Sequence, residues 1–181
     1  KTYIASIEKE IIKQGVGSFV KPGQFKIDYT GDHARQYISN GKKMWVYQKG
    51  DGQVMVVNVG TKVIAPEALD ALASFDHIDR DFNVESCTAG ELSMLKIDAV
   101  SIKQLQWLKL IKKNPKSQFE TVIVGFDPKT KLAALTVLMG KSGNLTRYVF
   151  TDLKTNAPID TALFNFKQEG IKEIKKSLLE E

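Results

Sequence analysis

Two short turn signals, each set between stretches in which apolar and polar residues alternate, constrain the fold of this chain most. Asn40-Gly41 and Asp51-Gly52 are typical of tight hairpins, because these residue types tolerate a positive φ angle. Before the first signal, Phe25 and Ile27 alternate with polar residues, which is the period of a strand with one apolar face. The stretch 18–59 is therefore predicted to form about four or five short antiparallel strands in a curved sheet.

Outside this stretch the pattern predicts more strands and few helices. A proline at position 66 favours a short helix over 66–75, and apolar spacing predicts an amphipathic helix over 171–178. The stretch 88–101 fits either a helix or a strand. Further strands are predicted over 3–12, 18–20, 81–87, 103–112, 119–126, 132–139 and 145–151. We therefore expect one mostly β domain over 1–181, folded as an antiparallel barrel or strongly curved sheet.

Composition argues against several classes of protein. The net charge is +5, but lysines are scattered and arginine occurs only at Arg35, Arg80 and Arg147, which does not predict nucleic-acid binding. Cys87 is the only cysteine, so an intramolecular disulfide is impossible. No apolar run reaches the length that spans a bilayer. The composition is that of an ordinary globular protein with a substantial core.

The residues that usually carry catalysis or bind metals show no recognised arrangement. His33 and His77 are the only histidines, and the acidic loop around His77 lacks a recognised metal-ligand spacing. The stretch 140–142 resembles the end of a phosphate-binding loop, but Leu135 stands where that motif requires glycine. No histidine is placed by the sequence beside Cys87. We therefore expect no enzyme activity, no metal and no cofactor.

The strands of 18–59 carry more large apolar side chains than the few predicted helices would cover. Two interpretations remain open, an ordinary closed core and a cavity for an apolar ligand, because strand parity does not distinguish them. The pattern alone favours the closed core. The side chains concerned are Phe19, Phe25, Ile27, Tyr29, Trp45 and Tyr47.

The sequence VKPGQFKIDY over 20–29, followed by ISNGKKMWVY over 38–47, resembles the periplasmic outer-membrane lipoprotein carrier family, LolA. The stretch 65–69 resembles the lid region of that family. Pieces of 110–115, 143–146 and 156–166 resemble its second half in the same order. The resemblance covers about 17–170, and the order and spacing of the pieces make it more specific than any single piece.

The resemblance implies an unclosed antiparallel β-barrel of about ten or eleven strands, with a short helical lid over a hydrophobic cavity. It implies a periplasmic carrier, or chaperone, that binds the acyl chains of lipoproteins and moves them from the inner to the outer membrane. The implied partners are acylated lipoproteins, an inner-membrane lipoprotein-release complex and an outer-membrane acceptor, with the carrier itself a monomer. A lipid- or lipoprotein-binding sensor or acceptor domain of the same fold is the alternative. The family's N-terminal helix has no counterpart before Tyr3.

The resemblance also assigns candidate site residues. Lys21 occupies the place where the family carries the arginine that ties the lid to the barrel, and lysine offers a point charge instead of a planar fork. The expected lid residues are Ile64, Pro66, Leu69, Leu72 and Phe75. The expected cavity-lining residues are Phe19, Phe25, Ile27, Tyr29, Ile38, Trp45, Tyr47, Val124, Phe126, Leu138, Tyr148 and Phe150.

Overall fold

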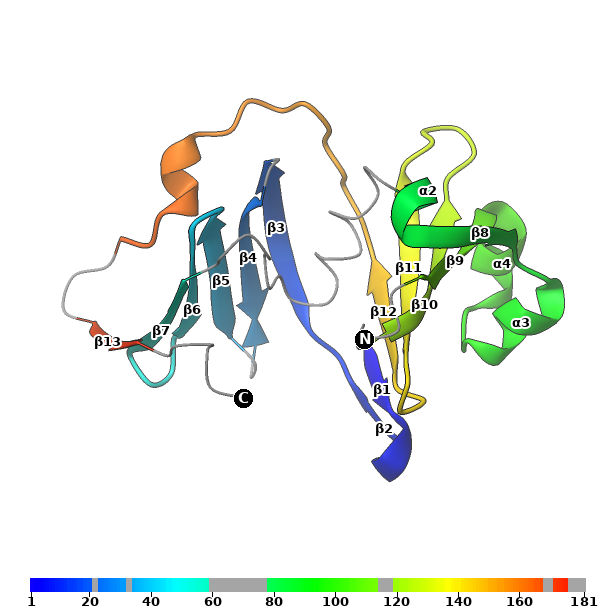
Figure 1. Ribbon diagram of the computed structural model, residues 1–181, viewed down its shortest axis with the longest axis horizontal. Helices are drawn as coiled ribbons and strands as arrows, with labels where there is room; N and C mark the ends of the chain where they lie inside the picture. Colours follow the sequence, from blue (N-terminus) through cyan, green and yellow to red (C-terminus); the bar gives the residue numbers. More distant parts are fainter. Residues whose placement is uncertain (21–22, 32–33, 59–77, 114–118, 168–170, 176–181) are drawn as a thin grey trace. The chain divides into compact units, whose positions relative to one another are not determined.

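The described chain is built mainly from strands. A computed structural model describes residues 1–181 except 21–22, 32–33, 59–77, 114–118, 168–170 and 176–181. In this described part, thirteen strands form two sheets, neither of which closes on itself (Figure 1). The predicted mostly β, unclosed fold is therefore confirmed, with its strands divided between two sheets.

The seven-stranded sheet has the strand order β2-β1-β12-β11-β10-β9-β8, and every neighbouring pair is antiparallel. Strands β8 to β12 follow the predicted segments closely. The bounds are β1 Thr2–Ile4, β2 Lys9–Ile11, β8 Phe82–Ser86, β9 Gln106–Lys112, β10 Phe119–Phe126, β11 Ala133–Gly140 and β12 Leu145–Val149.

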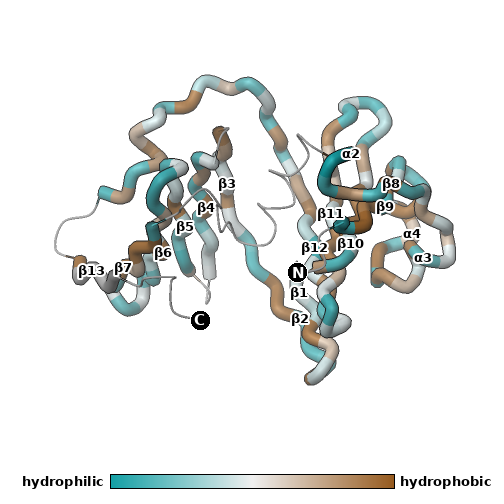
Figure 2. The backbone as a smooth tube through the Cα atoms, in the orientation of Figure 1, coloured by the Kyte–Doolittle hydropathy of each residue, from teal (hydrophilic) through white to brown (hydrophobic). Residues whose placement is uncertain are grey.

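The six-stranded sheet has the strand order β13-β7-β6-β5-β4-β3. Its strands are antiparallel except for β13, which runs parallel to β7. The bounds are β3 Gln14–Val20, β4 Gln24–Thr30, β5 Arg35–Asn40, β6 Lys43–Gln48, β7 Gln53–Asn58 and β13 Lys172–Lys175. Figure 2 shows apolar stretches, in brown, on strands of both sheets.

The described helical segments are short, and two of the α-helices are fixed by local capping. Helix α3 (Ala89–Met94) begins with a capping box, in which the Thr88 hydroxyl accepts from the Glu91 backbone N–H and the Glu91 carboxylate accepts from that of Thr88. Helix α4 (Ala99–Gln104) begins at Asp98, whose side chain accepts from the Ser101 backbone N–H. The others are α2 (Ile78–Asp81) and the 3₁₀ turns η1 (Ala5–Ile7) and η4 (Thr161–Phe164).

In the hairpin between β5 and β6, the two loop residues lie one position later in the sequence than the Asn40-Gly41 signal. Strand β5 ends at Asn40 and β6 begins at Lys43, so Gly41 and Lys42 form the two-residue loop. Gly41 has a φ of 84°, and glycine at the first loop position is typical of a type II′ turn. The Asn40 side chain accepts from the backbone N–H groups of Lys42 and Lys43. The asparagine therefore stabilises the loop from its flank.

Three local predictions need correction or completion. The single strand predicted over 3–12 is a hairpin, β1 and β2, whose turn places Glu8 in the left-handed conformation at a φ of 48°. The tail predicted as a helix contains the strand β13 over 172–175. The ambiguous stretch 88–101 contains helices α3 and α4. The predicted helix over 66–75 lies outside the described residues.

The chain divides into two compact units, and each unit combines two separate segments. One contains Lys1–Ile12 and Ser74–Thr155, and the other contains Lys13–Ala73 and Asn156–Glu181. The seven-stranded sheet belongs to the first unit and the six-stranded sheet to the second. Compactness alone does not decide whether a unit folds independently, so the single domain over 1–181 stays a prediction.

Candidate functional site

The six-stranded sheet carries a buried group of apolar side chains, here called the apolar cluster. The register of strands β4 to β7 places these side chains on one face of the sheet. Phe25 on β4 pairs with Ser39 on β5, Ser39 pairs with Met44 on β6, and Met44 pairs with Val57 on β7. The Tyr29 and Tyr37 rings meet edge to face at 5.9 Å, and burial raises the pKa of the Tyr29 hydroxyl. The apolar cluster consists of Phe25, Ile27, Met44 and Val57, with Tyr29, Tyr37 and Val46 packed against them.

Strand β3 extends the same face towards the edge of the sheet. Phe19 pairs with Phe25, and Gly17 pairs with Ile27. A Cβ atom at Gly17 would lie 2.8 Å from the Phe19 ring, so the absence of a side chain leaves room for that ring. Phe19 is 46% exposed, whereas Phe25 is buried. The face therefore passes from buried to exposed apolar surface across two neighbouring strands.

The opposite face of the six-stranded sheet carries Ile38, Trp45 and Tyr47, because their positions alternate with those of the apolar cluster. The segment after η4 packs on this face, where the rings of Tyr47 and Phe166 lie 5.4 Å apart. Thus the predicted lining residues of this sheet divide between two faces. Phe19, Phe25, Ile27 and Tyr29 share one face, and Ile38, Trp45 and Tyr47 share the other.

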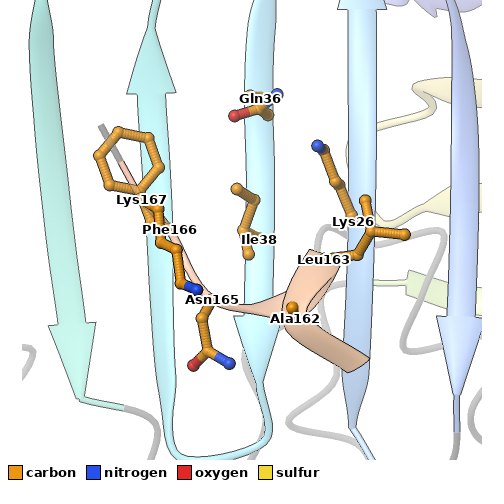
Figure 3. Close-up of a pocket in the computed structure, with 8 residues that line it drawn as sticks. All are labelled: Lys26, Gln36, Ile38, Ala162, Leu163, Asn165, Phe166 and Lys167. Carbon is orange, nitrogen blue, oxygen red and sulfur yellow. The ribbon is translucent and has the colours of Figure 1, made fainter. Parts of the chain in front are cut away.

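A pocket of about 300 Å³ lies between this opposite face and the segment 162–167 (Figure 3). Figure 3 shows Lys26 on β4 and Gln36 and Ile38 on β5, with the segment passing in front of these strands. The Asn165 side chain accepts from the Asn40 amide at 2.9 Å and fixes the segment to β5. The lining residues are Lys26, Gln36, Ile38, Ala162, Leu163, Asn165, Phe166 and Lys167. Two lysines and two amides share the lining with four apolar side chains, so the pocket is mixed in character.

Charged side chains also stand beside this pocket. Asp28 accepts from the Gln36 amide at 2.8 and 2.9 Å, and it lies 3.2 Å from Lys49 and 3.7 Å from Lys26. Burial raises the pKa of Asp28, but these hydrogen bonds and positive charges outweigh it and hold the pKa below its ordinary value. Asp28 therefore stays ionised near neutral pH. An apolar chain would have to desolvate charge to enter here.

The seven-stranded sheet has one face covered by helices. Side chains from α3 and the residues after it pack onto β10 and β11. Trp107 on β9 joins them and donates its indole N–H to the Ile102 carbonyl at 3.2 Å. The buried residues of this helix-covered core are Leu92, Leu95, Ile97, Ile123, Leu135 and Val137.

The other face of the seven-stranded sheet is here called the Val122 face. It consists of two neighbouring cross-strand rows, Val84, Leu110, Val122 and Leu138 in one and Leu108, Val124, Thr136 and Tyr148 in the other. The middle of each row is buried, whereas Val84 and Leu108 near the sheet edge are 48% and 38% exposed. This face therefore also combines buried and accessible apolar surface.

The structure places most of the remaining predicted lining residues on the Val122 face. Val124, Leu138 and Tyr148 belong to its rows, and the Phe150 ring stacks on Tyr148 at 6.5 Å. Phe126 ends β10, after a shift in register. The expected latch Lys21 and the expected lid residues Ile64, Pro66, Leu69, Leu72 and Phe75 lie outside the described residues.

Four members of the apolar cluster are not among the predicted lining residues: Tyr37, Met44, Val46 and Val57. The first three follow from parity only when the strand register is known. Once Phe25 and Ile27 are assigned to one face, an antiparallel neighbour contributes alternate residues to it, which selects Tyr37 on β5 and then Met44 and Val46 on β6. The predicted lining residues on β6 were instead the large aromatic residues Trp45 and Tyr47, which lie on the opposite face.

Neither a metal site nor a membrane-spanning helix is found in the described part of the chain. No three histidine, cysteine, aspartate or glutamate side chains there are grouped so as to hold a metal ion. Nor does any helix within the described ranges combine the length and apolar character required to cross a bilayer. His33 and His77 lie outside those ranges.

Fold and surface together define an open, mostly antiparallel β protein with extensive apolar faces. The family model "Outer membrane lipoprotein carrier protein LolA" matches residues 5–167. The chain therefore belongs to the LolA family, as the motifs around Pro22 and Gly41 indicated.

Curated relatives carry the name outer-membrane lipoprotein carrier protein. One from Methylococcus capsulatus is 31% identical over 83% of this chain and 66% of its own length. One from Chromobacterium violaceum is 29% identical over 81% of this chain and 64% of its own length. One from Methylibium petroleiphilum is 30% identical over 87% and 70%, respectively. The chain thus spans just under two thirds of the first two relatives.

Proposed function

We propose that this chain is a periplasmic lipoprotein carrier, a chaperone that binds the acyl chains of lipoproteins and moves them from the inner to the outer membrane. The observation that carries the proposal is the family match over 5–167, with relatives named as outer-membrane lipoprotein carriers. The proposed partners are acylated lipoproteins, an inner-membrane release complex and an outer-membrane acceptor. The carrier acts as a monomer, and no catalysis forms part of this role.

The apolar faces of the sheets support this proposal physically. An acyl chain gains about 0.8 kcal/mol for each CH₂ group that it buries. The apolar cluster and the Val122 face provide buried side chains next to exposed ones, such as Phe19 and Leu108. We propose that these two faces, rather than the pocket beside Asp28, which carries two lysines, contact the acyl chains. A carrier must also release its cargo, so binding must remain weak enough to reverse.

Cargo binding tests this proposal directly. The full chain is purified from bacteria that produce acylated lipoproteins, and the complex is analysed by native mass spectrometry. We expect the carrier mass together with the mass of an acylated protein or lipid. A mass of the carrier alone, together with no binding of a pyrene-labelled fatty acid ester, would contradict the proposal.

A matched pair of variants locates the contact. Val46 packs against the apolar cluster, whereas Val16 is 74% exposed on β3. Val46→Asp places a charge against the proposed acyl contact and is expected to abolish cargo retention. Val16→Asp introduces the same charge at an exposed position and should retain cargo. Circular dichroism of both variants checks that each is folded, and equal retention by folded variants would exclude the apolar cluster as the contact.

A further inference from the structure

The pocket on β4 and β5 has a wall, formed by η4 and the residues after it, that is held in place at several points. Phe164 has no exposed surface and anchors this wall. The Asn165 side chain accepts from the Asn40 amide at 2.9 Å, and the Phe166 ring lies 5.4 Å from that of Tyr47. The pocket, of about 300 Å³, is therefore preformed, and its volume is at the lower end of the range for ligand sites.

The described lining of this pocket carries positive charge and no carboxylate. Lys26 and Lys167 contribute one ammonium group each, and Figure 3 shows the Ile38 side chain between theirs. The Asp28 carboxylate stands beside the pocket, 3.7 Å from the Lys26 ammonium nitrogen. It is shared, however, with the Lys49 ammonium at 3.2 Å. One carboxylate therefore faces several lysines, and an excess of positive charge remains for a ligand.

The hydrogen bonds around the pocket also favour a ligand that accepts. Asn165 uses its side-chain oxygen for the Asn40 amide, which leaves its N–H₂ group to donate. The Gln36 N–H₂ group, by contrast, is occupied by both oxygens of Asp28. The Asp160 carboxylate, at the start of η4, accepts from a backbone N–H group of that turn. The donors that remain in the lining therefore suit an anionic acceptor.

Apolar side chains occupy the space between these charged groups. Ile38 is 3% exposed, whereas Leu163 is 40% exposed, so the pocket has a buried floor and an accessible rim. A free inorganic anion would leave the apolar surface uncovered, and a plain hydrocarbon chain would desolvate the lysines without pairing them. A peptide carries both groups at once, because side chains two residues apart lie on the same side of an extended chain. A carboxylate two residues from an apolar side chain therefore matches the pocket.

We propose that this pocket binds an acidic peptide segment of a partner protein. The carboxylate lies between Lys26 and Lys167, and the neighbouring apolar side chain covers Ile38. Because Ile38 follows Tyr37, which packs against the apolar cluster, the pocket and that cluster lie on opposite faces of the six-stranded sheet. The inference goes beyond the proposed carrier function, and it adds a docking site that stays accessible while cargo occupies the apolar cluster.

A blocked hexapeptide, acetyl-Ser-Leu-Ser-Glu-Ser-Gly-amide, tests the assignment in the full chain. Its blocked ends carry no charge, and its leucine and glutamate share one side when it is extended. Titration followed by the NMR signals of the backbone amides should give a Kd on the order of 1 mM, with the shifts confined to β4, β5 and 162–167. Replacing the glutamate by glutamine, or the leucine by serine, should weaken binding. Inorganic phosphate should bind more weakly than the peptide.

Variants of the chain locate the contact. Lys26→Met and Lys167→Met each remove one positive charge and should weaken binding of the hexapeptide roughly two- to fivefold. Lys9→Met removes the same charge at an exposed position on β2 and should bind the hexapeptide as wild type does. All three variants should retain the pyrene-labelled fatty acid ester. Saturation of wild type with that ester should leave the affinity for the hexapeptide unchanged, because the two sites lie on opposite faces of the sheet.

The outcomes separate this inference from the carrier proposal. Equal binding of the glutamate and glutamine peptides would overturn the docking site and leave the carrier function intact. So would phosphate binding as tight as that of the peptide, which would reduce the pocket to a small-anion site, or wild-type affinity in both pocket variants. Loss of the fatty acid ester with the peptide still bound would overturn the carrier function alone. Should Lys26→Met fail to fold, Lys167→Met outside the strands decides the matter.

Discussion

The two sheets bury their apolar side chains by different means. On the seven-stranded sheet, residues of and beside helices α3 and α4 pack on β10 and β11, and both helices begin at capping side chains. On the six-stranded sheet, all described members of the apolar cluster lie on strands β4, β5, β6 and β7. One core therefore combines strands with fixed helices. The other consists, within the described ranges, of strand residues alone.

We infer from this difference that the helix-covered core stabilises the fold, whereas the apolar cluster binds the ligand. A core that is capped, interdigitated and fully packed resists change, because close-packed interiors leave little room for added atoms. No helix of the described ranges packs on the apolar cluster, so a ligand bound there would displace none of the described helices. We therefore expect substitutions in the helix-covered core to change the free energy of unfolding, and substitutions in the apolar cluster to change acyl binding.

The largest expected effect is on the stability of the helix-covered core. Ile123 is almost fully buried under α3 and α4, so Ile123→Ala should lower the free energy of unfolding by about 2–5 kcal/mol. Urea denaturation measures this change, with the exposed residue substitution Ile12→Ala as a control of little effect. The folded variant should bind an acyl probe with wild-type affinity. A parallel loss of affinity would break the proposed division.

The next effect is on binding by the apolar cluster. Phe25→Ala removes a large buried ring from this cluster and should weaken binding of a pyrene-labelled fatty acid ester about ten- to a hundredfold. Fluorescence titration measures the affinity, and Ile123→Ala is the matched control for general destabilisation. If both folded variants bind equally well, the apolar cluster is not the acyl contact.

Overpacking gives a smaller effect on the helix-covered side. A Cβ atom at Gly125 would lie 2.8 Å from both Leu105 Cδ1 and the Trp107 ring, which is closer than real Cβ contacts. Gly125→Ala should therefore shift the Trp107 side chain and cost roughly 1–3 kcal/mol of stability. Tryptophan fluorescence and urea denaturation report the two changes. A variant as stable as wild type would show that Leu105 and Trp107 move aside for the added Cβ atom without loss of stability.

The smallest expected effect is a dependence of stability on pH near α3. Hydrogen bonds from Lys109 and Thr88 lower the pKa of Glu91 from its ordinary 4.5 to about 2. Because the folded-state pKa is lower than the unfolded one, this stabilisation is present above pH 4.5 and is lost as the pH falls towards 2. Lys109→Met should flatten the urea midpoint profile in that window. Lys103→Met is the control, and identical profiles for both would exclude the effect.

Much of the sheet structure was predictable because its signals are local. Gly41 and Gly52 mark turns that the structure confirms, and alternation located most strands. Helices α3 and α4 were also within reach, since Thr88 with Glu91 and then Asp98 are recognisable capping signals. The ambiguity of 88–101 arose from reading apolar spacing alone.

Other features depend on contacts between distant residues. Strand β13 has a composition typical of a helix, but its backbone pairs in parallel with β7, more than a hundred positions earlier in the sequence. The β1–β2 hairpin turns at Glu8 without a glycine signal. For the candidate site, most of the predicted lining residues lie on strands of the two sheets. The sequence could not separate the two faces around Trp45 without the register, or reveal that the buried Thr136 hydroxyl lacks a hydrogen-bond partner in the described part of the chain.

The joining of separate segments in each compact unit has a consequence for synthesis. As the chain leaves the ribosome, β3 to β7 emerge long before 156–175, which supplies both Phe166 beside Tyr47 and the parallel neighbour of β7. Until translation passes that point, β7 has an open edge that invites pairing with other chains. The six-stranded sheet is thus finished last, although five of its six strands emerge before β8 to β12. Such long-range closure is typical of slowly folding proteins.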